Sequence, residues 1–278
     1  GIMFEGIIYN DESSYSAAIG GGGGAAPGGG GGGAPGAVSA WTYGVTTGDT
    51  ADTVYATGSV TAVGDQSALQ IYDLAGGNDT VGDSDLNNPG LAGNDFIEGG
   101  DDNDTMYMGA GTDWAIGGVG NDIIYGDSAT GAFADIISGD LGSDWIYGGG
   151  GFDTLIGGSI TPNFFTDQTM ANIDVDLGVA DYFLFRQGEG DDVPGSPADP
   201  YNWIADFEDG VDLIGYHNGS EWNNNAFSEG ELTTSFTGGA TQVVEASSSD
   251  LLFLVNGNVT FDDTDLVSAI AISGQGIA

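Results

Sequence analysis

The stretch "GGVGNDIIYG", Gly117–Gly126, decides the fold because it joins a turn directly to a very short strand. Glycine and the Asn-Asp pair tolerate a positive φ, so they favour a tight turn. Ile-Ile-Tyr favours a strand, since branched and aromatic side chains suit a pleated, half-buried surface. A three-residue strand buries too little surface to persist alone. The stretch therefore predicts neighbouring copies of itself.

Such copies recur at a nonapeptide period. Two runs of aspartates keep this spacing, and an insertion near "SATG" separates them: Asp95, Asp104, Asp113 and Asp122, then Asp135, Asp144 and Asp153. An apolar residue follows each aspartate two positions later, from Ile97 to Leu155, with Ala115 the weakest. The apolar period continues upstream to Val54, and Asp79 belongs to it. A fixed short period predicts a solenoid.

Each nonapeptide can supply a turn and a short strand, so two nonapeptides close one coil. Coils then stack at the strand spacing of about 4.8 Å, with the apolar residues pointing inward. Aspartates that are two repeats apart fall on the same edge of adjacent coils. We therefore expect two rows, one of Asp95, Asp113, Asp135 and Asp153, the other of Asp104, Asp122 and Asp144.

The charge balance predicts that these rows need a cation from solution. The chain of 278 residues has 42 acidic side chains and one Lys or Arg, Arg186, which gives a net charge of −41. Stacked carboxylates about 5 Å apart repel each other. Oxygen ligands in flexible turns suit calcium, whereas magnesium demands a stricter octahedron and zinc or copper favours His or Cys. With one His and no Cys, the sequence indicates several Ca²⁺ ions, and Arg186 is expected to pair with a nearby carboxylate.

The repeats resemble a known family. "GGVGNDIIY" and "GGGGFDTLI" match the pattern G-G-x-G-x-D-x-U-x of the RTX (repeat-in-toxin) calcium-binding β-roll. Four other copies miss one glycine, and "TGAFADIIS" keeps one glycine and the aspartate. The resemblance implies an all-β, parallel β-roll with calcium between neighbouring turns, held by aspartates and glycine-loop carbonyls. The implied ligands are Asp79, Asp95, Asp104, Asp113, Asp122, Asp135, Asp144 and Asp153.

The resemblance extends past the roll. "DYFLFRQGEGDDV" and "YNWIADFEDGVDLIGY" are similar to the start of the C-terminal RTX domain of serralysin-type secreted proteins. The later "ATQVVEASSSDLLFLVNGNVTFDDTDLV" has the alternation and turn residues of antiparallel strands. We expect a C-terminal antiparallel β-sandwich-like capping domain. Within it, Asp206 and Asp212, with Asp209, would bind one more calcium ion or cap the turn.

Four segments are predicted: an apolar N-terminal strand or arm at 1–19, a Gly-rich segment at 20–44, the calcium-binding roll at 45–158 and the C-terminal domain at 159–278. The glycine tract Gly20–Gly36 is either a flexible linker or an ordered, packed segment. An apolar strand on such a tract is what strand donation to a neighbouring subunit needs. Solenoid ends also invite stacking. We expect self-association through the arm and the ends or edges of the roll.

Several function classes are disfavoured. The segment before the roll is too short for a catalytic domain, and H-E-x-x-H and G-x-S-x-G are absent, so no enzyme is expected. His217 is expected to be a surface or capping residue. Trp114 and Trp145 are expected to point outward, where exposed rings would stack on sugars or form a packing face. The negative charge argues against nucleic acid and anionic lipid, and no apolar run approaches membrane-spanning length.

The expected location and function follow from calcium. Extracellular calcium is millimolar, which suits weak sites of about 10⁻⁴–10⁻³ M. The resemblance implies type I export, with "DLVSAIAISGQGIA" as an uncleaved signal or as a last strand and tail. We expect a secreted calcium-binding structural protein that forms a filament or surface lattice. The alternatives are a monomeric adhesin-like module for a glycan, a surface or ice, and a secretion-and-folding module of a larger enzyme.

Overall fold

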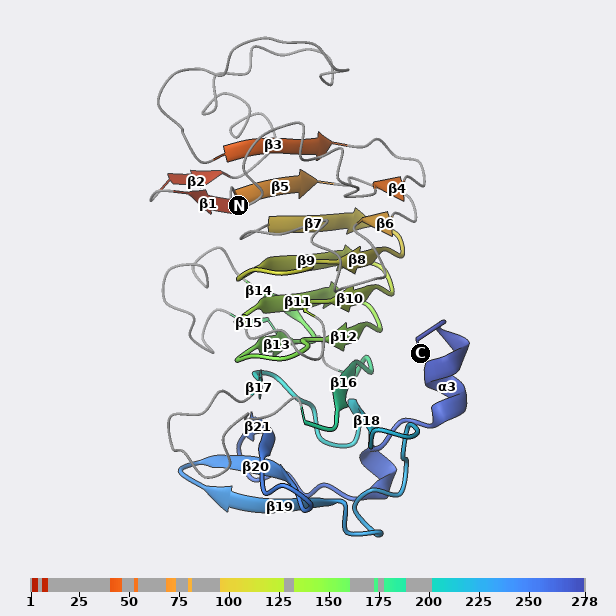
Figure 1. Cartoon of the computed structure of the whole chain (residues 1–278). Helices are drawn as coiled ribbons and strands as arrows, with labels where there is room; N and C mark the ends of the chain where they lie inside the picture. Colours follow the sequence, from red (N-terminus) through yellow and green to blue (C-terminus); the bar gives the residue numbers. More distant parts are fainter. Residues whose placement is uncertain are drawn as a thin grey trace.

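The computed structural model describes residues 96–127, 133–160, 178–188 and 202–277, together with strand segments at 2–4, 7–9, 41–46, 53–54, 69–73, 80–81 and 173–174. These residues form strands, one short α-helix, α3 (Ala269–Gly274), and one 3-10 turn at Asp263–Asp265. Two columns of parallel strands run along the length of the molecule (Figure 1). The expected all-β fold is therefore confirmed.

The two columns are two parallel sheets that share one interior. The first sheet contains β4 (Thr53–Val54), β6 (Thr80–Val81), β8 (Thr105–Tyr107), β10 (Ile123–Tyr125), β12 (Trp145–Tyr147), β16 (Tyr182–Arg186) and β18 (Leu213–His217). The parallel part of the second sheet contains β3 (Trp41–Thr46), β5 (Leu69–Asp73), β7 (Phe96–Asp101), β9 (Trp114–Val119), β11 (Ile136–Leu141), β13 (Thr154–Ile156), β17 (Asn202–Ile204) and β21 (Leu251–Asn256). Successive nonapeptides alternate between the sheets, as a β-roll requires.

The register confirms the predicted coil of two nonapeptides. Ile123 of β10 lies opposite Thr105 of β8 in the preceding coil and opposite Trp145 of β12 in the following coil. The insertion near "SATG" falls between Ile123 and Trp145 in the sequence, and these two strand residues still lie in register. The same pairing brings Ile124 over its counterparts in both neighbouring coils.

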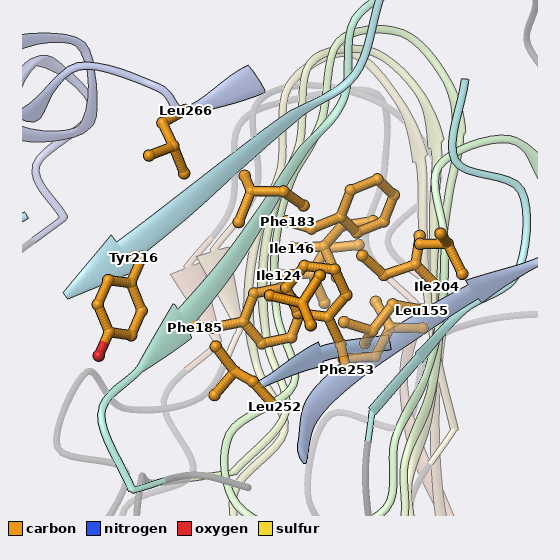
Figure 2. Packing of buried hydrophobic residues seen from close by; sticks show 14 of the residues in the cluster. Ile124, Ile146, Leu155, Phe183, Phe185, Ile204, Tyr216, Leu252, Phe253 and Leu266 are labelled. Carbon is orange, nitrogen blue, oxygen red and sulfur yellow. The ribbon is translucent and has the colours of Figure 1, made fainter. Parts of the chain in front are cut away.

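The interior of the roll holds the apolar residue of every described repeat. These residues are at most 1% exposed: Ile97, Met106, Ala115, Ile124, Ile137, Ile146 and Leu155. Figure 2 shows three of them, Ile124, Ile146 and Leu155, within the packed interior. Upstream, Val54 pairs with Val81 in the strand register, as the apolar period predicts. The intervening Val63 lies outside the described residues.

The parallel stacking continues beyond residue 158. β16 pairs with β12 and β17 pairs with β13, both in parallel, so the chain crosses the predicted boundary at 158 and 159 without ending the sheets. The antiparallel strands come last, where β19 (Leu232–Thr237) and β20 (Ala240–Glu245) follow β21 in the second sheet. The expected antiparallel closing structure is present, and it is built onto the end of the roll. The segment boundaries themselves stay a prediction.

Aromatic side chains fill the interior where the roll closes. Phe183, Phe185 and Phe253 are fully buried there, and the rings of Phe185 and Phe253 stack with centroids 4.5 Å apart (Figure 2). Tyr216 lies at the margin of the same cluster. Large aromatic side chains thus pack the interior where the roll closes, as the close packing of protein interiors requires.

Both tryptophans of the roll lie on the outer faces, but the expectation that Trp145 is exposed is wrong. It is 6% exposed, stacks on Tyr182 at 4.0 Å between centroids, and belongs to a cluster with Ile272 of α3. Trp114 is half-buried and packs in a separate cluster with Ile160 of β14 (Ser159–Ile160), which pairs with β15 (Ile173–Asp174). Later segments of the chain cover part of each face.

The two ends of the chain form small elements of their own. β1 (Ile2–Phe4) and β2 (Ile7–Tyr9) pair with each other in antiparallel fashion, so the apolar arm contains two short strands. At the other end, a last strand with a tail was one of the two readings of the sequence. The structure has the helix α3 there instead, and the Ser268 side chain caps its N-terminus by accepting the Ala271 N–H. The tract Gly20–Gly36 lies outside the described residues.

Candidate calcium-binding centre

The aspartates of the repeats form two rows, one along each edge of the roll. In the first row, the backbone N–H of Asp104 donates to Oδ1 of Asp122 at 2.7 Å, and the N–H of Asp122 donates to Oδ1 of Asp144 at 2.7 Å. The second row repeats this arrangement with Asp113, Asp135 and Asp153, at 2.8 and 2.9 Å. The spacing of two repeats per coil predicted these two rows.

The second oxygen of these carboxylates points into the protein without a hydrogen-bond donor. Within the described residues, Oδ2 is buried and accepts no hydrogen bond in Asp122, Asp127, Asp135, Asp144 and Asp153. A buried charged oxygen without a partner is unfavourable by several kcal/mol in general. Five such oxygens in one short solenoid therefore indicate that a partner from solution completes the structure.

Glycines leave open the space that these oxygens face. A Cβ atom at Gly117 would collide with Oδ2 of Asp122 and with the carbonyl oxygen of Gly139. A Cβ at Gly139 would in turn collide with Oδ2 of Asp144 and approach the carbonyl oxygen of Gly157. The first glycine of the repeat is thus required where a carboxylate and a carbonyl oxygen of neighbouring coils converge.

Burial makes these carboxylates hard to ionise in the absence of a cation. It raises the pKa of Asp122 and of Asp153 to about 7, and the pKa of Asp144 to about 9. Burial also raises the pKa of Asp135 well above its ordinary value, and the charges of Asp113 and Asp153 add to that effect. A bound cation would remove this penalty, because it favours the charged form.

The cationic side chain of the protein is engaged elsewhere. The guanidinium of Arg186 lies over the ring of Tyr147, at 5.7 Å, and over that of Trp222, at 5.2 Å. Its expected pairing with a carboxylate stays a prediction. His217 contacts the edge of Trp222 and accepts the N–H of Gly219 on Nδ1 at 3.1 Å, which agrees with the expected capping role.

The donor set suits a hard cation. Within the described residues, no three His, Cys, Asp or Glu side chains form a metal-binding cluster by themselves. An ion would therefore be shared between carboxylates of adjacent coils and backbone carbonyls, such as Asp122 and Asp144 with the carbonyl of Gly139. Calcium takes six to eight such oxygens in flexible geometry, and water supplies those that the protein does not. The residues present fit calcium, which would supply the missing positive charge.

Two predicted ligands of the C-terminal region make different contacts. Asp206 accepts the N–H groups of Gly157 and Gly158, both at 2.9 Å. Asp212 accepts the N–H of Asp181 at 3.1 Å and that of Glu208 at 2.7 Å, which closes the turn at 208–212. Asp212 thus closes a turn and also extends the first row through Asp181, whereas Asp206 holds two glycines of the roll. A calcium role for either residue stays a prediction. Asp79 and Asp95 lie outside the described residues.

Sequence reasoning missed three polar members of these edges. Asp181 continues the first row, because its Oδ1 accepts the N–H of Asp144 at 2.9 Å. Asn202 continues the second row by accepting the N–H of Asp153 at 3.2 Å. Both come two positions before a buried inward residue, which is the repeat's own signal. The long connections after residue 160 hide it by breaking the nonapeptide spacing. The third, Asp127, has no such signal.

Two departures from the repeat pattern have a conformational explanation. Asp140 replaces the glycine at position two of its repeat and Asp102 replaces the glycine at position four, and their φ angles are +76° and +78°. Aspartate is among the side chains that tolerate this left-handed region. The turn therefore keeps its shape in copies that miss a glycine.

Comparison with known proteins agrees with this geometry. The family model described as the RTX calcium-binding nonapeptide repeat matches residues 90–115, 109–130 and 129–159. No curated protein matches the chain. The serralysin-type resemblance of the C-terminal region stays a prediction.

The family match also bears on location. Proteins with RTX repeats are typically secreted. Among the described residues there is no helix of the length and apolarity needed to span a membrane. Residues 90–159 therefore carry RTX calcium-binding nonapeptide repeats, and such repeats bind several calcium ions.

Proposed function

We propose that this protein is a secreted, non-enzymatic structural protein whose folding and self-assembly outside the cell are driven by calcium. The observation that carries the proposal is the set of buried Oδ2 atoms that have no donor in the described roll. They face glycine turns and carbonyl oxygens of the neighbouring coil. Such a roll is incomplete until cations enter it.

Calcium would then control when the protein folds. The unfolded chain has no ordered site, so the free energy of binding several ions stabilises the folded roll. Where calcium is scarce, the buried carboxylates must take up protons or the roll must open. In millimolar calcium the same residues link one coil to the next. This dependence suits a protein that is exported unfolded and folds afterwards.

The end of the second sheet supports assembly. β19 is the terminal strand, and its residues 233–237 are exposed, with Phe236 55% exposed. The segment 232–244 has no Asp or Glu, although the chain has 42 acidic residues. Soluble proteins commonly protect sheet edges with charges. An uncharged edge is suited to pairing with a strand of another copy, and the apolar arm of β1 and β2 is one candidate.

Electron microscopy of the full chain with and without calcium tests the proposal. We expect regular filaments or sheets in millimolar calcium and dispersed chains after chelation. Monodisperse particles in calcium would instead favour the adhesin-like alternative. Deleting residues 1–19 should leave a folded, calcium-binding monomer. If that truncated chain still polymerises, the arm is not the connector, and the edge of β19 can be tested with Thr234→Lys.

A further inference from the structure

Asp127 is a buried carboxylate that the repeat pattern does not require. It follows Gly126 in "GDSATGAFAD" and, by its backbone pairing with the neighbouring turns, occupies the second position of a repeat, where the pattern has glycine. The equivalent positions in the coils before and after it are Gly109 and Gly149. Asp127 therefore adds a carboxylate that these neighbouring turns lack.

The turn holds this side chain inside the protein. Asp127 is 2% exposed, and its backbone N–H donates to the carbonyl oxygen of Gly148 at 2.9 Å. The N–H of Phe133 donates to one carboxylate oxygen. The other oxygen, Oδ2, is fully buried and accepts no hydrogen bond from the described residues. One half of the carboxylate is thus anchored and the other half has no donor.

Two other buried carboxylates interact electrostatically with Asp127. The charge of Asp153 acts directly on Asp127, and Asp127 in turn acts on Asp135. Both of those aspartates also bury an Oδ2 without a donor. Glycine makes the approach possible, because a Cβ on Gly149 would meet the Asp127 Cβ at 2.9 Å. Buried anions that repel one another in this way are unstable without a compensating cation.

The opposite edge of the roll offers a contrast. Asp140 also replaces the second glycine of its repeat, but it adopts a positive φ and is half-buried. Asp127 is not among the described non-glycine residues with positive φ, and it is fully buried. The same substitution in the repeat pattern therefore leaves one aspartate half-buried and buries the other.

We propose that Asp127 is an additional calcium ligand, which acts with Asp153 across adjacent coils and gives this turn a calcium position with more negative charge than the regular repeats. Affinity for calcium rises with the number of charged ligands. This position therefore fills first as the calcium concentration rises. The proposal rests on calcium binding by the roll and is independent of self-assembly.

A purely structural role makes a different prediction. If Asp127 only caps the inserted segment through Phe133, its replacement weakens the protein equally with and without calcium. If it is a ligand, Asp127→Asn removes a buried charge while one oxygen remains to accept the Phe133 N–H. The calcium-free protein then keeps or gains stability, and only the calcium-loaded protein loses it. The change in stability that Asp127→Asn causes in chelator therefore separates the two roles: a loss indicates a structural role, and no change or a gain indicates a calcium ligand.

The test is a calcium titration of the full-length Asp127→Asn protein. Calorimetry measures the affinities, and native mass spectrometry counts the bound ions. Asp101→Asn is the matched control, because Asp101 is an exposed acid of the same roll. We expect the tightest calcium-binding step to weaken by at least about tenfold in Asp127→Asn, with the control unchanged. Equal affinities and ion counts in the variant and the control would overturn the proposal.

A crystal structure of the calcium-loaded wild-type protein gives a second, direct measurement. We expect an ion at about 2.3–2.6 Å from an oxygen of Asp127. An Asp127 carboxylate bonded only to protein groups would overturn the proposal even if the variant fails to fold. Failure of the protein to form filaments would affect the proposed function and leave this result standing.

Discussion

The roll and the region that closes it handle buried acidic groups in opposite ways. In the roll, residues 96–160, each of four row aspartates buries one oxygen without a donor: Asp122, Asp135, Asp144 and Asp153. In the cap, residues 202–277, Glu245 is 1% exposed and accepts hydrogen bonds from Tyr216 at 2.7 Å and from Ser248 at 2.9 Å. The two regions share continuous sheets and differ in where the partners of buried charge come from.

This difference teaches which part of the fold depends on ions. Buried polar groups are stable when protein donors satisfy them, as in the cap, where Asp250 is the described carboxylate that still buries an oxygen without a donor. Phe253 of the cap also stacks on Phe185 of β16, so aromatic packing supports this region. The roll buries few apolar side chains in each half coil, and its row aspartates bury oxygens without donors, so we expect it to rely on cations between coils. We therefore expect the cap to retain structure under conditions that open the roll.

The largest expected effect is that of removing calcium near neutral pH. Chelation should unfold the roll, because its buried carboxylates then repel each other without a counter-ion. Far-UV circular dichroism should lose much of its β signal, and limited proteolysis should cut within residues 96–160 before 202–277. Adding calcium back should restore both. An unchanged β signal in chelator would contradict the ion dependence of the roll.

Acidification should partly replace calcium. Burial raises the pKa of Asp122 and Asp153 to about 7 and that of Asp144 to about 9, from an ordinary value of 3.8. Above pH 3.8 the unfolded chain releases these protons, whereas the folded calcium-free roll retains them. The stability they confer is therefore complete below pH 3.8 and is lost as pH rises through about 7 to 9.

Far-UV circular dichroism in chelator, at several pH values between about 5 and 8, measures this dependence as the fraction of the roll that is folded. The calcium-free protein should be more stable at the acidic end. Values close to the isoelectric point of about 4.1 are avoided, because low net charge promotes association. In saturating calcium this change of stability with pH should become smaller or reverse its sign, since calcium competes with protons for the carboxylates. Stability of the calcium-free roll that increases with pH would contradict the assigned burial.

Phe253→Ala should destabilise the protein whether or not calcium is present. Phe253 is fully buried and stacks on Phe185 at 4.5 Å, so truncation leaves a cavity in the cap. Such changes lower the free energy of unfolding by about 3–5 kcal/mol. Phe236→Ala, at an exposed position of β19, is the control and should change stability little. A loss seen only in calcium would mean that the cap has no stability of its own.

The sequence predicted the regular part of this molecule well because one signal is repeated there. Each copy sets an aspartate two positions before an inward residue, so the period, the register and the two rows follow from the positions of Asp104, Asp122 and Asp144. The prediction fails where tertiary structure adds contacts that spacing does not encode. Trp145 points outward as expected, yet it is covered by the cluster that contains Ile272.

The same limit applies to the candidate site. Asp181 and Asn202 continue the rows, but long connections separate them from the last regular repeat, so counting residues could not place them. Asp127 could not be recognised because the insertion follows it: counting back from Asp135 places Gly131, and not Asp127, at the second position of the repeat. Its burial depends on Gly149, which belongs to the next coil and therefore lies far from Asp127 along the chain.

The smallest predicted effect concerns a single hydrogen bond of the cap. Tyr216→Phe removes the hydroxyl group that donates to Oε1 of Glu245 at 2.7 Å and leaves the rest of the ring in place (Figure 2). A buried carboxylate that loses a donor should lower the free energy of unfolding by about 1.5–3 kcal/mol. Urea unfolding in calcium measures this loss, with Ser235→Ala on exposed β19 as the control. Because both partners lie in the cap, the loss should be similar with and without calcium. A loss seen only in calcium would show that this hydrogen bond forms only after the roll has bound calcium. The cap would then fold after the roll and would not be stable independently of it.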